Sequence, residues 1–300
     1  MFLQKLLGDV SKQQFSAEYL HRLPFAQAST AGEFSSWASW ELLGRLLERH
    51  ADAMVVRQGA RWSGELPANL HQAHQLCDEG WTILVRHAEQ HDHQLKNIAE
   101  SFQADFHAPV NIHLYVTPAG THGFSWHYDA EDVFIVQTTG RKEYSLRKNT
   151  VNPWPLVETI PADMRYEREL MPMMRVELRA GDWLYIPCGY WHKADALPDD
   201  EAAISLAIGV MAPSAIDLLE FLRPRLLSSL LWRQRLPTLG DASPEGGKDV
   251  DRQLQDVCAM LADELARILR NEHLPQQFLE WQRQRPAAAS VDPLPETPEC

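Results

Sequence analysis

Seven short segments of strand-forming residues fill the region from about Val110 to Met211. In chain order they read NIHLYVT, FSWHYD, DVFIVQT, KEYSLR, RVELR, WLYIP and AISLAIGV. Gly, Pro and Asn lie between them, and these residues interrupt strands and form turns. Many short strands with frequent turns fold as a β-sandwich or a barrel. We therefore expect a mainly β core over residues 110–212.

The chain before this core mixes helical and strand signals, so residues 1–109 are expected to form a helical flank that feeds strands into the sheet. Apolar residues recur every three or four positions over Trp37–His50, which predicts an amphipathic helix. The other expected elements are strands at 53–57 and 81–86 and polar helices at 69–79 and 89–102. Within the core, residues 149–174 contain four prolines and are expected to form a long insertion between strands.

The chain after the core turns helical again over residues 213–285. Ile216–Trp232 and Val250–Leu269 each carry a wide apolar face at helical spacing. These faces need a partner, which is either the sheet or a second copy of the chain in a homodimer. Residues 240–248 are expected to be a flexible connection, and the proline-rich residues 286–300 a disordered tail.

Composition limits the class of protein. Hydrophobic residues make up 45% of the chain and charged residues 23%, an ordinary globular balance. No segment approaches the roughly 18 consecutive apolar residues of a membrane helix, so we expect a cytoplasmic protein that does not bind membranes. The net charge of -13 disfavours nucleic-acid binding and suits a basic peptide or protein partner.

The cysteines show no paired spacing. They lie at Cys77, Cys188, Cys258 and Cys300. Neither a disulfide framework nor a zinc ribbon is expected from such scattered positions.

Three residues form a candidate metal site. His127 and Asp129 lie two residues apart in the strand-like segment FSWHYD, so both side chains should leave the same face of a strand. A third ligand, His192, follows a Gly-Asp turn, a strand and a proline in RAGDWLYIPCGYWHKADA. Two imidazoles and one carboxylate form the facial triad of non-haem iron oxygenases. A His-x-Asp motif alone also occurs by chance, so the downstream histidine carries much of the prediction.

The segments THGFSWHYDAEDVFIVQTTGRKEYSL and LRAGDWLYIPCGYWHKADA resemble the JmjC, or cupin-like, oxygenases, and most closely their ribosomal oxygenase branch. The resemblance runs from about Phe15 to about Ala212. It implies a double-stranded β-helix, or jelly roll, with a helical N-terminal flank and a C-terminal helical extension. It also implies iron(II), 2-oxoglutarate as co-substrate, and dioxygen, with His127, Asp129 and His192 as metal ligands and catalytic residues.

The same resemblance assigns three residues to 2-oxoglutarate. Lys142 stands where the family places a basic residue that pairs with the distal carboxylate, and Tyr115 matches a tyrosine that hydrogen-bonds the co-substrate. Ser205 could add a hydroxyl from a late strand. Each has a structural alternative: Lys142 could be a solvated residue of a hairpin turn, Tyr115 an ordinary strand aromatic, and Ser205 a polar position facing away from the core.

Two departures from the family pattern concern the substrate. Position 113 is a histidine where many relatives carry an asparagine, and His113 either helps to bind the substrate or is a satisfied core histidine. A C-terminal winged helix is not expected in the residues after the core.

We expect hydroxylation of an amino-acid side chain, with arginine or histidine favoured, in a protein or peptide. Histone demethylation is disfavoured, because that branch usually carries a glutamate as the second ligand. Two alternatives remain: a hydroxylase of a natural-product peptide or small molecule, and a non-catalytic metal-binding cupin.

Overall fold

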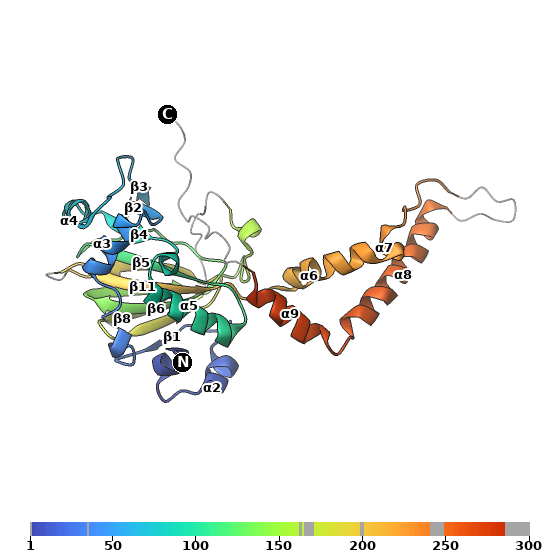
Figure 1. Cartoon of the computed structure of the whole chain (residues 1–300), viewed down its shortest axis with the longest axis horizontal. Helices are drawn as coiled ribbons and strands as arrows, with labels where there is room; N and C mark the ends of the chain where they lie inside the picture. The colour runs from blue at the N-terminus through green and yellow to red at the C-terminus, as the bar shows by residue number, and fades with distance from the viewer. Residues whose placement is uncertain are drawn as a thin grey trace. The chain divides into compact units, whose positions relative to one another are not determined.

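The computed structural model describes residues 2–34, 36–161, 164, 171–198, 201–240 and 249–285. These residues divide into two compact units, one ending at Ala212 and the other running from Pro213 to Arg285 (Figure 1). Each unit has its own apolar cluster.

Two antiparallel sheets build the first unit (Figure 1). Among the described residues the larger sheet has eight strands, in the spatial order β1 (Phe25–Gln27), β9 (Trp183–Ile186), β6 (Asp132–Thr139), β11 (Ala203–Val210), β5 (Val110–Thr117), β4 (Thr82–Val85), β2 (Ala53–Arg57) and β3 (Ala60–Arg61). The smaller sheet has the order β10 (Trp191–Ala196), β7 (Arg141–Arg147) and β8 (Met174–Arg179). The strands before residue 110 therefore extend the same sheet as those after it.

Most of the expected strands form, and one segment does not. FSWHYD lies in the connection between β5 and β6, where His127 makes an isolated β-bridge to His192. β10 was not expected, because its sequence WHKADA is too polar to resemble a buried strand. It forms because it pairs with β7 along its whole length, from Trp191 opposite Arg147 to Ala196 opposite Lys142.

Five α-helices accompany the sheets in the described part of the first unit: α1 (Phe2–Leu7), α2 (Lys12–Glu18), α3 (Trp40–Glu48), α4 (Leu70–Asp78) and α5 (His93–Phe106). Short 3-10 turns lie at Gly32–Phe34, Ala88–Gln90 and Val157–Thr159. The helix expected from residue 89 begins only at His93, because the Asp92 carboxylate caps the N–H groups of Gln94 and Leu95. The last of the 3-10 turns falls in the insertion expected at 149–174, most of whose second half lies outside the described residues.

The two faces of the larger sheet carry side chains of different size along β11. Successive side chains of a strand point to opposite sides. On β11 the large residues Ile204, Leu206 and Ile208 join the main apolar cluster, whereas Ser205, Ala207 and Gly209 alternate with them on the other side. The inner side of this strand is therefore lined with small residues.

The apolar face packs against the helices. Phe134 of the sheet is the centre of a network of aromatic rings. It contacts Phe15 of α2 and Phe102 of α5. It also contacts Trp183 and Tyr185 of β9, and Tyr185 contacts Phe15 as well. Each of these five side chains is at most 2% exposed. Burial of so many large aromatic groups stabilises the unit.

The opposite face meets the smaller sheet. Val133, Ile135, Leu184 and Ile186 of the larger sheet pack against a second group of apolar residues that includes Tyr144, Leu146 and Leu178. A large and a small antiparallel sheet thus enclose a common interior. The double-stranded β-helix predicted from the sequence is confirmed.

The second unit is helical and consists of α6 (Ala215–Ser228), α7 (Leu230–Arg233), α8 (Val250–Leu269) and α9 (Leu274–Arg283). α8 has the predicted bounds. The helix expected over 216–232 is instead interrupted at Ser229, and α9 was not expected. The flexible connection and the tail predicted at 240–248 and 286–300 fall almost wholly outside the described residues.

Two predictions from the sequence concern membrane-spanning helices and disulfide bonds. No helix in the described ranges is both long and apolar enough to cross a membrane. Cys77, Cys188 and Cys258 are free thiols, and Cys300 lies outside the described residues.

A buried carboxylate fastens the N-terminal segment to the sheet. Asp132, 1% exposed, accepts hydrogen bonds from the Tyr185 hydroxyl at 2.5 Å and the Cys188 backbone N–H at 3.2 Å. The Nδ1 atom of His21 lies 2.7 Å from the second carboxylate oxygen. This hydrogen bond raises the pKa of His21 above its ordinary value, against the opposing effect of burial.

The His21 contact predicts a pH dependence of stability. A raised histidine pKa in the folded state stabilises the protein fully below the unfolded pKa of about 6.5 and loses that effect as the pH rises through the folded value. We expect His21→Asn to narrow the stability gap between about pH 6 and about pH 8.5 measured by urea unfolding. Asparagine also tolerates the positive φ of 58° at this position. An equal effect of the substitution at both pH values would contradict the assignment.

Candidate active site

The two predicted histidine ligands are held together by their backbones. His192 is the second residue of β10, and its N–H donates to the carbonyl oxygen of His127 at 2.8 Å. The N–H of His127 donates back to the His192 carbonyl at 3.1 Å. Because this reciprocal pair joins a loop to a strand, it sets the positions of two imidazoles that are far apart in the sequence.

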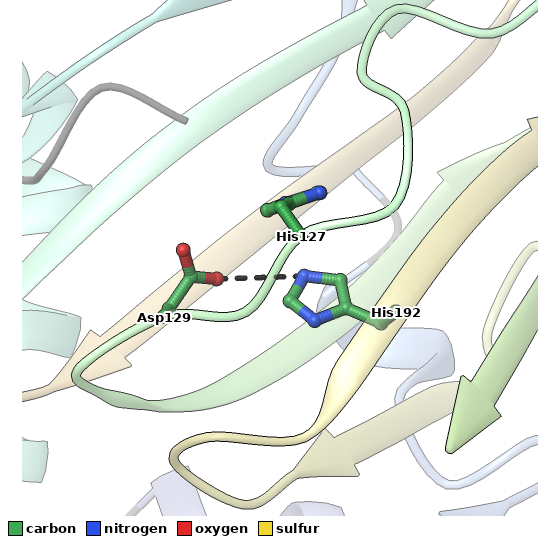
Figure 2. A group of neighbouring side chains, drawn as sticks. All are labelled: His127, Asp129 and His192. Atoms are coloured by element: carbon green, nitrogen blue, oxygen red, sulfur yellow. Dashed lines mark ion pairs between the residues drawn. The ribbon is translucent and has the colours of Figure 1, made fainter. Parts of the chain in front are cut away.

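Asp129 completes the group, as Figure 2 shows. One ligand atom from each of His127, Asp129 and His192 lies within 4.8 Å of the others. The Nε2 atom of His192 is 3.4 Å from a carboxylate oxygen of Asp129. The Asp129 backbone carbonyl accepts from the Gly189 N–H at 2.9 Å, so this loop is also tied to the turn before β10.

Both imidazoles have the tautomer that a metal requires. The Nδ1 atom of His127 lies 2.8 Å from the Ser125 carbonyl, and that of His192 lies 3.0 Å from the Tyr190 carbonyl. A carbonyl oxygen can only accept, so each Nδ1 carries the proton and each Nε2 keeps its lone pair. Burial, and then the charge of His127, lower the pKa of His192 to about 4. This donor set of neutral imidazole and carboxylate fits a divalent transition metal.

The structure therefore brings together all three residues that the sequence predicts, but the local structure that holds them differs from the prediction. The prediction placed His127 and Asp129 on one face of a strand. They lie instead in a loop whose ends are fixed by the bridge to His192 and by the bond to Gly189.

A cavity of about 100 Å³ lies between the two sheets beside these side chains. The residues around it include Met54, Thr82, Leu84, Arg86, His113, Tyr115, Phe124, His127, Asp129, Glu131, Val133, Ile135, Lys142, Tyr144, His192, Ala194 and Ala207. Apolar and polar groups thus share one pocket with the candidate ligands, which is typical of a small-molecule site.

Lys142 points into this cavity from β7 and is not a solvated hairpin residue. It is 3% exposed, and its ammonium group donates to the Ser205 hydroxyl at 3.0 Å. It also lies 5.5 Å from the centre of the Tyr115 ring. Burial lowers the pKa of Lys142 to about 7, because the charged form is poorly solvated there.

Tyr115 lines the cavity from β5, and Ser205 has a supporting position. Burial, and then the charge of Asp129, raise the pKa of Tyr115, so its hydroxyl stays protonated and can donate a hydrogen bond. Ser205 is opposite Tyr115 in the strand register and is 1% exposed. Its hydroxyl contacts Lys142, whereas the surface of the cavity is formed by its neighbours.

His113 is only half satisfied. Its Nδ1 accepts from the His87 backbone N–H at 3.2 Å, while no partner of Nε2 is found within the described ranges. Burial lowers the pKa of this histidine to about 4, so the ring is neutral and Nε2 carries its proton. The interpretation of His113 as a satisfied core histidine therefore accounts for Nδ1 and not for Nε2. The His113 side chain also lines the cavity.

Two charged residues of the cavity were missed by sequence reasoning. Arg86 contacts both oxygens of Asp52, at 2.8 and 3.1 Å. Glu131 accepts from the Asn111 amide at 2.9 Å, and burial followed by the charge of Asp129 raises the pKa of its carboxyl to about 8. The available signal was the polar alternation of Asn111, His113 and Tyr115 along β5.

Comparison with known proteins shows which families and structures this chain resembles. The model of the JmjC domain family matches residues 83–218. The bifunctional lysine-specific demethylase and histidyl-hydroxylase NO66 of Drosophila yakuba is 25% identical over 94% of this chain and 47% of its own length. Ribosomal oxygenase 1 of Gallus gallus is 25% identical over 77% of this chain and 41% of its own length. The chain thus spans less than half the length of these curated relatives.

Solved structures agree on the fold. Two of them are structures of Escherichia coli YcfD, one of which is described as a ribosomal oxygenase in complex with cobalt and 2-oxoglutarate. The alignment with the cobalt complex has a TM-score of 0.57 at 15% identity and covers 93% of this chain and 72% of the YcfD chain. The other gives a TM-score of 0.58 at 21% identity over 94% and 74% of the two chains. Residues 83–218 of this chain are thus similar to the JmjC domain family, and they include His127, Asp129 and His192.

Proposed function

We propose that this chain is an iron(II)- and 2-oxoglutarate-dependent oxygenase that hydroxylates an amino-acid side chain in a protein or peptide. The observation that carries the proposal is one cavity containing both the three ligand side chains and the buried Lys142. The names of the relatives, which include a histidyl-hydroxylase and ribosomal oxygenases, support it.

His127, Asp129 and His192 would hold the iron. Their ligand atoms converge, and their tautomers leave Nε2 of each histidine available. When bound, iron and 2-oxoglutarate supply the oxidising power for inserting oxygen into a C–H bond. The protein contributes the fixed ligands and a cavity in which they share one space with Lys142 and Tyr115.

Lys142 and Tyr115 would hold 2-oxoglutarate by its distal carboxylate. A dicarboxylate bound to metal at one end needs a cation at the other, and Lys142 presents a buried ammonium in the same cavity. Ser205 would orient Lys142 through its hydroxyl rather than contact the co-substrate.

The target side chain is proposed as arginine or histidine. The names of the relatives support a protein substrate, and a hydroxylase of a natural-product peptide or small molecule is the alternative within the same chemistry. The alternative without oxygenase chemistry is a non-catalytic metal-binding cupin. Such a protein would have no function for the buried ammonium of Lys142. Cytoplasmic location stays a prediction.

Loss of one ligand should abolish both metal binding and turnover. We expect the wild-type protein, loaded with iron(II) without oxygen, to show the absorption band of an iron 2-oxoglutarate complex and to release succinate with arginine or histidine peptides. His127→Ala should remove the band and the succinate, because two remaining ligands hold iron weakly. His93→Ala, which changes a histidine at the start of α5, is the matched control. Full succinate release by His127→Ala would refute the proposal.

Binding of 2-oxoglutarate should take up a proton. The pKa of Lys142 is about 7 in the empty cavity and should rise beside a carboxylate, so affinity should fall by up to about tenfold per pH unit above 7. Calorimetry in two buffers of different ionisation enthalpy measures this uptake. Lys142→Met should abolish it and weaken binding by about 30-fold or more, whereas the exposed Lys148→Met should not. Unchanged proton uptake in Lys142→Met would assign the effect to another group.

We also propose that the C-terminal helices form a homodimer. Several large apolar residues of the second unit lie exposed, at Ile216, Leu219, Leu227, Leu230 and Leu236. On α6 the exposed residues continue the apolar side of Leu218, Leu222 and Leu226, which join the internal cluster, and widen it. An apolar surface wider than the part covered within the unit needs a further partner, and another copy of the same unit provides a matching surface.

Sedimentation tests the dimer. We expect the wild-type chain to sediment as a dimer and Leu219→Glu combined with Leu227→Glu to sediment as a monomer, because each introduced carboxylate would be buried in the interface. Gln255→Glu adds one charge to an exposed position of α8 and serves as the control. A monomeric wild-type chain at micromolar concentration would overturn the proposal.

A further inference from the structure

A groove of about 500 Å³ lies on the first unit, between the segment that follows β3 and the helix α4. Its lining shares no residue with the cavity beside the metal ligands. The proposed function therefore leaves this groove without a role.

Both walls of the groove are positioned by contacts within the chain. On one side, the indole N–H of Trp62 donates to the Glu65 carbonyl at 3.1 Å. A Cβ at Gly64 would lie 2.7 Å from the Trp62 ring, so a glycine lets the backbone turn this closely over the indole. On the other side, the Asn69 side chain caps α4 by accepting from the Gln72 backbone N–H at 3.0 Å. The groove is therefore shaped before a partner arrives.

Apolar side chains line much of the groove. They are Trp62, Leu66, Pro67 and Leu76. Trp62 packs edge-on against Trp81, with 4.9 Å between the ring centroids, but it is only partly buried. Leu66 is 51% exposed. An indole and an aliphatic side chain that stay accessible on a fixed support form a surface that a protein partner can cover.

The charged residues of the groove lining are all acidic. They are Glu65 on the first wall and Asp78 and Glu79 at the end of α4. All three are exposed, and none of them forms an ion pair with another residue in the described part of the chain. Arg57 reaches the Glu79 backbone carbonyl at 2.9 Å and lies over the Trp81 ring, so its guanidinium is engaged away from these carboxylates. An apolar groove bordered only by negative charge is complementary to a basic chain that carries an apolar side chain.

Other occupants match this surface less well. The parts of this chain outside the described ranges carry no net positive charge, and the whole chain has a net charge of -13. A segment of the same chain, or a second copy of it, would therefore bring like charges together in the groove. Within the described ranges these carboxylates also do not gather with other ligands as a metal site.

We propose that this groove binds a basic peptide segment of a partner protein, in which an apolar side chain lies between lysine or arginine residues. The apolar side chain packs on Trp62 and Leu66, and the cations on either side of it lie at the carboxylates of the two walls. The inference goes beyond the proposed function, because neither the metal nor 2-oxoglutarate takes part in it.

Three short peptides separate the two components of binding. The full chain is titrated into Lys-Lys-Leu-Lys-Lys, Gln-Gln-Leu-Gln-Gln or Lys-Lys-Gly-Lys-Lys, each acetylated, amidated and carrying a neutral fluorophore whose anisotropy is measured. We expect the first peptide to bind about tenfold more tightly than the second, because several exposed ion pairs each contribute a small factor. It should also bind about fivefold or more tightly than the third, because the leucine buries apolar surface. Higher salt should weaken its binding, since exposed charges are screened.

A matched pair of variants locates the binding surface. Glu65→Gln, Asp78→Asn and Glu79→Gln in one chain remove the three charges of the groove lining and keep the size of each side chain. This variant should lose about tenfold in affinity for Lys-Lys-Leu-Lys-Lys. Asp9→Asn, Glu18→Gln and Glu100→Gln change the net charge equally at exposed positions outside the groove and should leave the affinity within about twofold of wild type. Equal urea-unfolding midpoints show that both variants are folded.

Four results would overturn the inference: no binding of the leucine peptide with lysines, equal binding of the glutamine peptide, equal binding of the glycine peptide, or equal loss of affinity in the two variants. The last result would assign the attraction to the overall charge of the protein. All titrations are made without iron and 2-oxoglutarate, so their outcome is independent of oxygenase activity.

Discussion

Alternation of large and small side chains on β11 is the constraint on which the rest of the structure depends. Ile204, Leu206 and Ile208 turn one face of the sheet into a surface that helices must cover. Ser205, Ala207 and Gly209 leave space on the other face, where a cavity can exist without opening the core. Because both sets alternate along one strand, the same strand supplies the packing against the helices and the space for the cavity.

The candidate metal centre uses backbone hydrogen bonds to place groups that lie on a loop. His127 and His192 exchange a reciprocal pair of N–H to carbonyl bonds, and Asp129 is tied to Gly189. Each imidazole is then oriented by a carbonyl two residues earlier in its own segment. Hydrogen bonds of this kind orient metal ligands even where the ligands lie on a loop.

Ionisable side chains from different elements line the same cavity. Lys142 comes from the smaller sheet and lies near Tyr115 and Ser205 of the larger one. Glu131 lies beside Asn111 and opposite Gly209. The ammonium of Lys142 donates to a neutral hydroxyl, and the carboxyl group of Glu131 accepts from a neutral amide. The strong dependence of buried charges on a partner makes such a cavity selective for ligands of defined charge.

The sequence by itself determined the chemistry of the site. The residue types and spacing of His127, Asp129 and His192 predict a metal centre, and the resemblance carried by the same segments assigned Lys142 and Tyr115. Short strands with turns predicted the β core, because strand propensity and turn residues act locally. Only the tertiary structure decided that FSWHYD is a loop, that the polar WHKADA is a strand, and that Glu131 shares a space with Gly209. These features depend on which strands are neighbours and in what register, as with Gly209 opposite Asn111, and no local pattern encodes a contact between residues so far apart in the chain.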